Sequence, residues 1–346
     1  MTKKIFILGA NGFIGNTLIQ RILETTDWSI SGIDLSSDRI DKFLNHSRFH
    51  FKKEDMTQCS EWIEEQIQNC DVVLPLAAIA IPSVYVKDPL RIFHLDFIAN
   101  LEIIKLCVKH KKRVVFPSTS EVYGMCEDAE FDEETSNFIL GPIQKERWIY
   151  SCSKQMLDRV IYAYGKHEDL QFTLFRPFNW IGSTQDSIYN TQEGSSRVVT
   201  QFISNILHGK NIQLTNGGSQ KRCFTDIDDG ISALMKIIEN PQNCADGKIF
   251  NIGNPQNNIS IKTLAQTLLE LAHHYEELKE KASQCQIVNV DSDQYYGSNY
   301  QDTQHRVPSI KNAEKILHWI PKIDYKRSLS KILSAYFNRI GESVLT

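Results

Sequence analysis

Tyr150 and Lys154 are the residues whose types and spacing point most directly to chemistry. They are four positions apart in a stretch expected to be helical, so a phenol and an ammonium lie on one helix face and can act together. A nearby cation lowers the pKa of a phenol, and the phenolate can remove a proton from an alcohol while hydride leaves the same carbon. Upstream, residues 118–124 (STSEVYG) follow an apolar run, where a hydroxyl could hydrogen-bond the same substrate oxygen.

A glycine pattern near the N-terminus predicts a binding site for the dinucleotide that would accept this hydride. Gly9, Gly12 and Gly15 form a GxxGxxG run between an expected strand and an expected helix. Such glycines allow a tight turn and close approach to a pyrophosphate, which the helix N-terminus attracts. Asp34 follows 19 residues after Gly15, where a carboxylate can bind both ribose hydroxyls and repel a 2′-phosphate, so NAD is favoured over NADP. The expected cofactor-binding residues are Gly9, Asn11, Gly12, Phe13, Ile14, Gly15, Asp34, Asp55, Met56, Leu76, Ala77, Ala78, Tyr150 and Lys154.

The elements that must position these residues alternate between short β-branched runs and longer amphipathic stretches, which is typical of βαβ units on a parallel sheet. The expected strands are 4–8, 29–34, 49–52, 71–75, 113–117, 171–175 and 248–251, and the expected helices are 14–25, about 100–110, a segment after position 150, and 197–208. We therefore predict an α/β fold. Residues 1–179 should form a Rossmann-like doubly wound parallel sheet, to which parts of 225–255 return, and 180–346 should form mainly a smaller α/β substrate-binding domain.

Bulk properties exclude several classes of function. The 346-residue chain has a formal net charge of −4, so no positive field favours nucleic acid as a partner. Its eight cysteines are scattered without a CxxC pair, so we expect no metal site, no disulfide framework and a reducing compartment. Met1 lies almost directly before an apolar strand, and no apolar stretch approaches the roughly 20 residues of a membrane helix. We expect a cytoplasmic protein with no membrane partner.

Longer stretches around these motifs resemble the extended short-chain dehydrogenases, a family of nucleotide-sugar epimerases, dehydratases and decarboxylases. The likeness extends over nearly the whole chain and is carried by GANGFIG, PLAAIA, FPSTSEVYGM, RWIYSCSKQ, FTLFRPFNWIG, GGSQKRCFTDIDDG, FNIGNP and YYGSNYQDTQHRVP. Within the family, the chain is most similar to the UDP-glucuronate decarboxylase domain of bifunctional polymyxin-resistance proteins, and next to plant UDP-apiose/UDP-xylose synthases. The resemblance implies NAD-dependent oxidation of UDP-glucuronate at sugar carbon 4, then loss of CO2 to give UDP-4-keto-pentose.

The same resemblance assigns roles to individual side chains. The implied catalytic residues are Tyr150, Lys154, Glu121, Ser120, Thr119 and Arg222. Thr119 would contact the carbon 4 oxygen, and Lys154 would hold the nicotinamide ribose. Glu121 and Arg222 would flank the sugar carboxylate, whose like charge is expected to raise the pKa of Glu121 and make it a proton donor. The implied contacts to the UDP-sugar are Asn179, Arg197, Arg222, Tyr300 and Arg306.

Several alternatives stay open at this point. Arg222 could bind a phosphate of UDP, and Asn179 could cap a turn. A 4,6-dehydratase would need an acid beside the glutamate, where dehydratases of the family have Asp-Glu and this chain has Ser120 before Glu121. A 4-epimerase needs no glutamate there, and an inactive NAD sensor is a further alternative. Retained NADH would give UDP-xylose or UDP-apiose. Because family members commonly dimerise through the helix of Tyr150 and the helix around 100–110, we expect a homodimer or higher oligomer.

Overall fold

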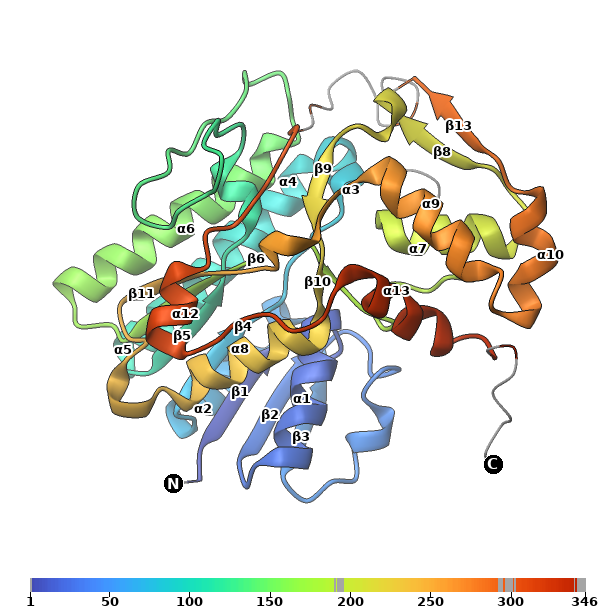
Figure 1. Cartoon of the computed structure of the whole chain (residues 1–346). Helices are drawn as coiled ribbons and strands as arrows, with labels where there is room; N and C mark the ends of the chain where they lie inside the picture. The colour runs from blue at the N-terminus through green and yellow to red at the C-terminus, as the bar shows by residue number, and fades with distance from the viewer. Residues whose placement is uncertain are drawn as a thin grey trace.

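The computed structural model describes residues 2–189, 191, 196–291, 295, 301, 303–338 and 340. Figure 1 shows two packed parts: a large sheet layered with helices, which contains the N-terminus, and a smaller part at the upper right of the view. None of the helices within the described residues is long and apolar enough to cross a membrane.

The central sheet has seven strands among the described residues, and all of its pairings are parallel. From one edge to the other the strands are β11 (Lys248–Ile252), β6 (Phe172–Pro177), β5 (Arg113–Pro117), β4 (Val72–Pro75), β1 (Lys4–Leu8), β2 (Ser29–Asp34) and β3 (Phe49–Lys53). The chain winds outward in opposite directions from β1 and β4. Ligands of doubly wound sheets bind beyond the carboxyl ends of the strands at such a reversal of strand order.

Both faces of the sheet are covered, which explains why its strands are almost entirely apolar. Along β1, Ile5 and Ile7 point into one core while Phe6 and Leu8 point into the other, because successive side chains alternate between faces. One face packs against α1 (Phe13–Thr25), α8 (Ile227–Glu239) and α12 (Lys311–Leu317), and the other against α2 (Ser60–Asn69), α5 (Asn100–Lys109) and α6 (Trp148–His167). The resulting layered α/β fold confirms the predicted fold class.

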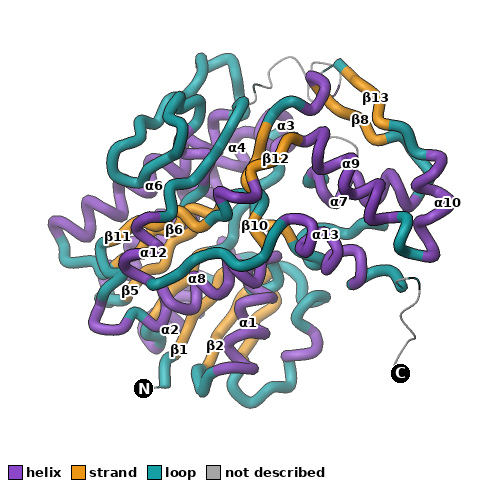
Figure 2. The backbone as a smooth tube through the Cα atoms, viewed as in Figure 1, coloured by secondary structure: helices purple, strands orange, loops and turns teal. Residues whose placement is uncertain are grey.

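The smaller part has its own apolar core, formed mainly by helices (Figure 2). Its helices are α7 (Val198–Leu207), α9 (Ile261–Ala272), α10 (Glu276–Gln284) and α13 (Tyr325–Ser334). Its short strands pair two by two: β8 (Ile212–Thr215) with β13 (Ile287–Val290), β9 (Lys221–Cys223) with β12 (Asn258–Ser260), and β7 (Trp180–Ile181) with β10 (Thr225–Asp226). The division of the chain at residue 179 stays a prediction, since β11 and α12 come from the later residues but pack with the large sheet.

Short helical turns connect many of these elements. They are α3 (Pro82–Lys87), α4 (Pro89–Ile92), the π-helical η3 (Phe93–Ala99), and the 3-10 turns η1 (Asp41–Phe43), η2 (Met56–Gln58), η4 (Ser120–Tyr123), η5 (Asn216–Gly218), η6 (Pro241–Asn243) and η7 (Pro255–Asn257). Most predicted strands and helices agree with the structure to within one or two residues, the usual uncertainty of element ends. One difference matters for the site: the helix expected after position 150 begins at Trp148, so Tyr150 lies in its first turn.

Candidate active site

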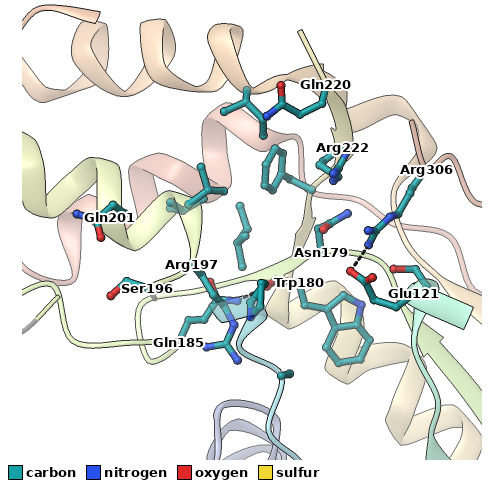
Figure 3. A pocket seen from close by; sticks show the side chains of 18 of the residues that line it. Glu121, Asn179, Trp180, Gln185, Ser196, Arg197, Gln201, Gln220, Arg222 and Arg306 are labelled. Atoms are coloured by element: carbon teal, nitrogen blue, oxygen red, sulfur yellow. Dashed lines mark hydrogen bonds and ion pairs between the residues drawn. The ribbon is translucent and has the colours of Figure 1, made fainter. Parts of the chain in front are cut away.

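A pocket lies between the sheet and the smaller part, and residues from both line it (Figure 3). The sheet side contributes the turn η4, the start of α6 and the loop after β6. The smaller part contributes α7, β8 and β9. Four of the predicted catalytic positions line its wall near the sheet: Thr119, Ser120, Glu121 and Tyr150.

The glycine turn after β1 is built to approach an anion closely. Gly9 has a φ of +88°, and a Cβ there would lie 2.7 Å from the Ala77 nitrogen in the loop after β4. A Cβ on Gly15 would lie 2.4 Å from the carbonyl oxygen of Gly9, so only glycine fits. Helix α1 starts after Gly12 without a side-chain cap or an acidic residue in its first turn, which leaves its first N–H groups available to a diphosphate.

Asp34 ends β2 beside this turn. Its carboxylate accepts hydrogen bonds from the backbone N–H groups of Asn11, at 2.9 Å, and Leu35, at 2.7 Å. Burial raises the pKa of Asp34, and these N–H groups act in the opposite direction. A carboxylate has more acceptor sites than these two bonds use, so the arrangement fits a dinucleotide ribose. Leu76, Ala77 and Ala78 follow β4, and this segment starts in contact with Gly9 of the glycine turn. Met56 packs against the core on one face of the sheet. Asp55 is exposed, and its carboxylate caps η2 by accepting a hydrogen bond from the Thr57 N–H.

Asp34 therefore gives a prediction about the cofactor. Replacing Asp34 with alanine should shift the ratio of NAD to NADP affinity about tenfold toward NADP, because a charged hydrogen-bond acceptor and a repulsive charge are both lost. Equilibrium titration of both dinucleotides measures this ratio. Asp41→Ala, at an exposed position in η1, is the matched control, and an unchanged ratio in the Asp34 variant would remove this residue from cofactor selection.

Tyr150 is buried in the first turn of α6. Its ring stacks on Tyr85 of α3, with centroids 4.7 Å apart and planes 6° from parallel. Burial raises the pKa of Tyr150 well above its ordinary value, and the charges of Asp96 and Glu121 raise it further, while a hydrogen bond with Thr119 and the charge of Arg197 lower it. In the chain alone, desolvation and two carboxylates therefore outweigh Arg197 and the hydrogen bond. The lowering expected from an ammonium together with a nicotinamide cation applies to the chain with its cofactor bound, and it stays a prediction.

Lys154 lies one turn further along α6, with a side chain that is 1% exposed. Its ammonium donates to the carbonyl oxygen of Pro117 at 3.1 Å and lies 3.8 Å from a carboxylate oxygen of Asp96. Burial lowers the pKa of Lys154, and Asp96 and Asp158 raise it. Asp96 itself, fully buried in η3, has its pKa raised to about 6 by burial against the opposing effect of Lys154. Sequence reasoning missed Asp96; the available signal was one acidic residue within the apolar stretch FHLDFIA.

Glu121 is held between two buried arginines. Arg306 approaches one carboxylate oxygen at 2.6 Å, and Arg147 forms an ion pair with the other oxygen. Arg222 adds a third positive charge from β9, while its guanidinium also donates to the carbonyl oxygens of Lys221 and Thr303. Burial raises the pKa of Glu121, but the three arginines outweigh it and hold the pKa at about 2. The upward shift expected beside a substrate carboxylate applies to the chain with that substrate bound, and it stays a prediction.

The structure adds partners of Glu121 to the one expected from the sequence. Arg222, expected to act with Glu121, is close enough for its charge to lower the pKa of that glutamate. Arg306, expected to contact UDP, is ion-paired with Glu121 (Figure 3). Sequence reasoning did not single out Arg147, although this residue lies in the quoted stretch RWIYSCSKQ. The available signal was a charged residue directly before a helix that packs in the core. Tyr300, which was also expected to contact the UDP-sugar, lies outside the described residues.

This cluster has a consequence for acid stability. Because the folded pKa of Glu121 is about 2 and its ordinary value is 4.5, its charge stabilises the fold fully above pH 4.5, and the stabilisation is lost as pH falls toward 2. The contribution is about 3 kcal/mol. Glu121→Gln lacks this titration, so the difference in free energy of unfolding between the two proteins should shrink from pH 5 to pH 2.5, as measured by urea unfolding. A constant difference would show that Glu121 is not held as a carboxylate by the arginines.

Two further predicted substrate contacts line the pocket, one from the loop after β6 and one just before α7. Asn179 has a φ of +42°, and among the described residues its buried Nδ2 atom has no hydrogen-bond partner. It follows β6 and precedes no helix, so its side chain is available to a ligand rather than used as a cap. Arg197 precedes α7 and pairs with Asp186 at 2.6 Å. Both residues point into the pocket in Figure 3.

The fold and the site together define a Rossmann-fold enzyme with a tyrosine–lysine pair next to a dinucleotide cradle. The family model described as the NAD dependent epimerase/dehydratase family matches residues 5–253. The chain belongs to this family, and its cofactor is NAD, as predicted.

Three solved structures place the chain among its relatives. The PbgP3 protein from Burkholderia pseudomallei is 54% identical, with 97% of this chain and 96% of that chain covered and a TM-score of 0.88. The UDP-glucuronic acid 4-epimerase from Bacillus cereus, in complex with UDP-glucuronic acid and NAD, is 22% identical, with 96% and 100% covered and a TM-score of 0.79. The dTDP-glucose 4,6-dehydratase from Bacillus anthracis, in complex with NAD, is 20% identical, with 97% and 96% covered and a TM-score of 0.77. The last two share the fold.

Proposed function

We propose that this enzyme oxidises UDP-glucuronate at sugar carbon 4 and then releases the carboxylate as CO2, which gives UDP-4-keto-pentose. The observation that carries the proposal is the arginine cluster at the reacting end of the pocket. Glu121 is close enough to Tyr150 to affect its pKa, and three arginines surround that single glutamate. Arg222 and Arg306 line the pocket beside Glu121, and arginine is well suited to bind a carboxylate in a fixed orientation.

The oxidation step needs a base and a fixed alcohol. Tyr150 would accept the proton of the carbon 4 hydroxyl, and Arg197 and the hydrogen bond with Thr119 oppose the burial that raises its pKa. Lys154 is held by the Pro117 carbonyl and Asp96 below it, where it would orient the ribose next to the reacting carbon. When bound, NAD supplies the acceptor for the hydride. Stacking on Tyr85 would keep the phenol from turning away from its substrate.

The second step follows from the ketone, which lies β to the carboxylate. The bond between carbons 5 and 6 breaks, its electron pair forms an enolate across carbons 4 and 5, and CO2 leaves. Arg306 and Arg222, which both line the pocket, would orient the carboxylate for this cleavage. Entry of a second negative charge beside Glu121 would raise its pKa from about 2, so that Glu121 could return a proton to carbon 5. Ser120 is buried beside it and offers no acid for the elimination of water that a dehydratase performs.

The proposal is tested by incubating the protein with NAD and UDP-glucuronate and following the products by mass spectrometry. A nucleotide sugar lighter by one CO2 and two hydrogens, formed together with NADH, supports it. A product of unchanged mass with inverted carbon 4 identifies a 4-epimerase, and loss of water identifies a dehydratase; either result rejects the proposal. Formation of UDP-xylose or UDP-apiose would mean that the enzyme decarboxylates its substrate but uses the NADH again to reduce the product, in place of releasing it. UDP-glucose, which has no carboxylate, is the control substrate.

We also propose that the partner of the chain, besides the UDP-sugar, is a second copy of itself. Met156 and Tyr162 on α6 are 51% and 53% exposed, and Leu90 on α4 and Ile98 on η3 are 68% and 39% exposed. Met156 and Tyr162 lie on one of the two helices through which the resemblance implies dimerisation, and Leu90 and Ile98 lie on the helical turns that lead directly into the other, α5. Sedimentation velocity should give a dimer that Met156→Glu converts to a monomer, because burying an unpaired charge in an apolar interface is costly. A monomeric unmodified protein would reject the proposal.

A further inference from the structure

Tyr123 stands at the centre of a buried polar chain that the proposed mechanism does not use. It ends the turn η4, two residues after Glu121, and its side chain is fully buried. The Tyr123 hydroxyl donates to Oδ1 of Asn251 at 2.8 Å and accepts from Nη1 of Arg176 at 2.9 Å. Both hydrogen-bonding capacities of the phenol are therefore used, and its partners come from β11 and β6, which are neighbours in the sheet.

One arm of this chain reaches the helix of the tyrosine–lysine pair. Arg176 contacts a carboxylate oxygen of Asp158 at 3.2 Å, and the Ser118 hydroxyl donates to the same oxygen at 2.7 Å. Asp158 lies on α6, four positions after Lys154 and on the same helix face. Ser118 directly precedes Thr119. This arm ties the base-bearing helix to the turn that carries Glu121.

The other arm reaches the segment that carries Arg306. The Asn251 amide nitrogen donates to the carbonyl oxygens of Phe131, at 2.8 Å, and Ser309, at 3.2 Å. Phe131 in turn accepts from the Ser309 backbone N–H at 2.9 Å and donates its own N–H to Val307 at 2.7 Å. Residues 303–309 are thus anchored to the sheet through Asn251, and Arg306 is within this anchored segment.

The ring of Tyr123 has enough apolar support without its hydroxyl. Phe131 and Phe138 lie 4.9 and 5.4 Å from it between centroids, and the Arg176 guanidinium lies 5.0 Å from the ring centre. A phenylalanine would fill the same space. The hydroxyl must therefore be explained by what it connects, since burying an oxygen without need carries a desolvation cost.

We propose that Tyr123 is a positioning residue: its hydroxyl joins the turn of Glu121, the helix of Lys154 and the segment of Arg306, and so sets the glutamate and the arginine opposite each other for a substrate carboxylate. Only the claim that these residues bind a substrate carboxylate rests on the proposed function. The connection of the three segments through the Tyr123 hydroxyl rests on the hydrogen bonds described above.

Tyr123→Phe tests the inference by removing one oxygen and two hydrogen bonds. We expect the affinity for UDP-glucuronate and the rate of CO2 release each to fall about tenfold, the usual effect of losing a buried hydrogen bond to a charged group. The affinities for NAD and for UDP-glucose, which lacks the carboxylate, should stay unchanged. A purely structural role would weaken all three ligands together, so this split separates positioning from general destabilisation.

Tyr164→Phe, on the outer part of α6, is the matched control. If Tyr123→Phe does not fold, Ser118→Ala carries the test, because it removes only the bond to Asp158; we expect about a threefold loss confined to UDP-glucuronate. This inference is overturned if the Tyr123 variant binds every ligand as tightly as the control does, or if its affinities for all ligands fall equally. Neither result bears on the proposed function. Failure of the unmodified protein to release CO2 overturns the proposed function instead.

Discussion

Replacing Tyr150 with phenylalanine is expected to lower the rate constant for NADH formation from UDP-glucuronate by about 10³-fold. The variant keeps the ring and its stacking on Tyr85 but removes the group that accepts the substrate proton. Because the hydroxyl makes its main contribution in the transition state, the dissociation constant for UDP-glucuronate should change much less than the rate. Stopped-flow absorbance of NADH, with binding measured by calorimetry, separates the two quantities.

The control for this prediction is Tyr164→Phe, a partly buried tyrosine about four turns further along the same helix. It should behave as the unmodified protein does. A Tyr150 variant that forms NADH at more than about a tenth of the normal rate would mean that another group takes the proton, since general base catalysis is worth more than this.

Glu121→Gln is expected to separate binding from catalysis. The amide preserves volume but removes the negative charge between Arg147 and Arg306, so the cluster becomes more positive and UDP-glucuronate should bind several-fold more tightly. CO2 release should fall about 100-fold, because the amide cannot return a proton to carbon 5. Arg147 loses its buried carboxylate partner, so the free energy of unfolding should fall by about 3 kcal/mol.

Isothermal titration with UDP-glucuronate and the rate of labelled CO2 release measure the two effects on one sample. UDP-glucose binding is the matched control and should stay unchanged, since that sugar places no charge in the cluster. Weaker binding of UDP-glucuronate together with slower CO2 release would contradict the charge argument, because it would mean that Glu121 itself contacts the substrate favourably.

The sequence was sufficient for features that depend on neighbours in the chain. Strands such as β1 and β5 are apolar runs buried on both faces, and the glycine turn and the spacing of Tyr150 and Lys154 are local patterns with one structural solution. Asp34 could be found because the length of one βα unit fixes where the second strand ends. These features were predicted nearly to the residue.

The arginine cluster could not be predicted in the same way. Arg306 and Glu121 are 185 positions apart, and no local pattern states which of several arginines reaches a given glutamate once the chain has folded. Asp96 was missed for the same reason, because its importance comes from Lys154 on another helix. The directions of the Glu121 and Tyr150 pKa shifts in the chain alone depend on these contacts, whereas the predicted shifts concern the chain with a substrate carboxylate and a nicotinamide bound.

The most direct test of the account follows carbon 6 of UDP-glucuronate. With this carbon labelled, the protein and NAD should release one labelled CO2 and form one NADH for each UDP-glucuronate consumed. If the label stays entirely within the nucleotide sugar while the substrate is converted, the three arginines around Glu121 serve some other chemistry and the decarboxylation proposed for this enzyme is wrong.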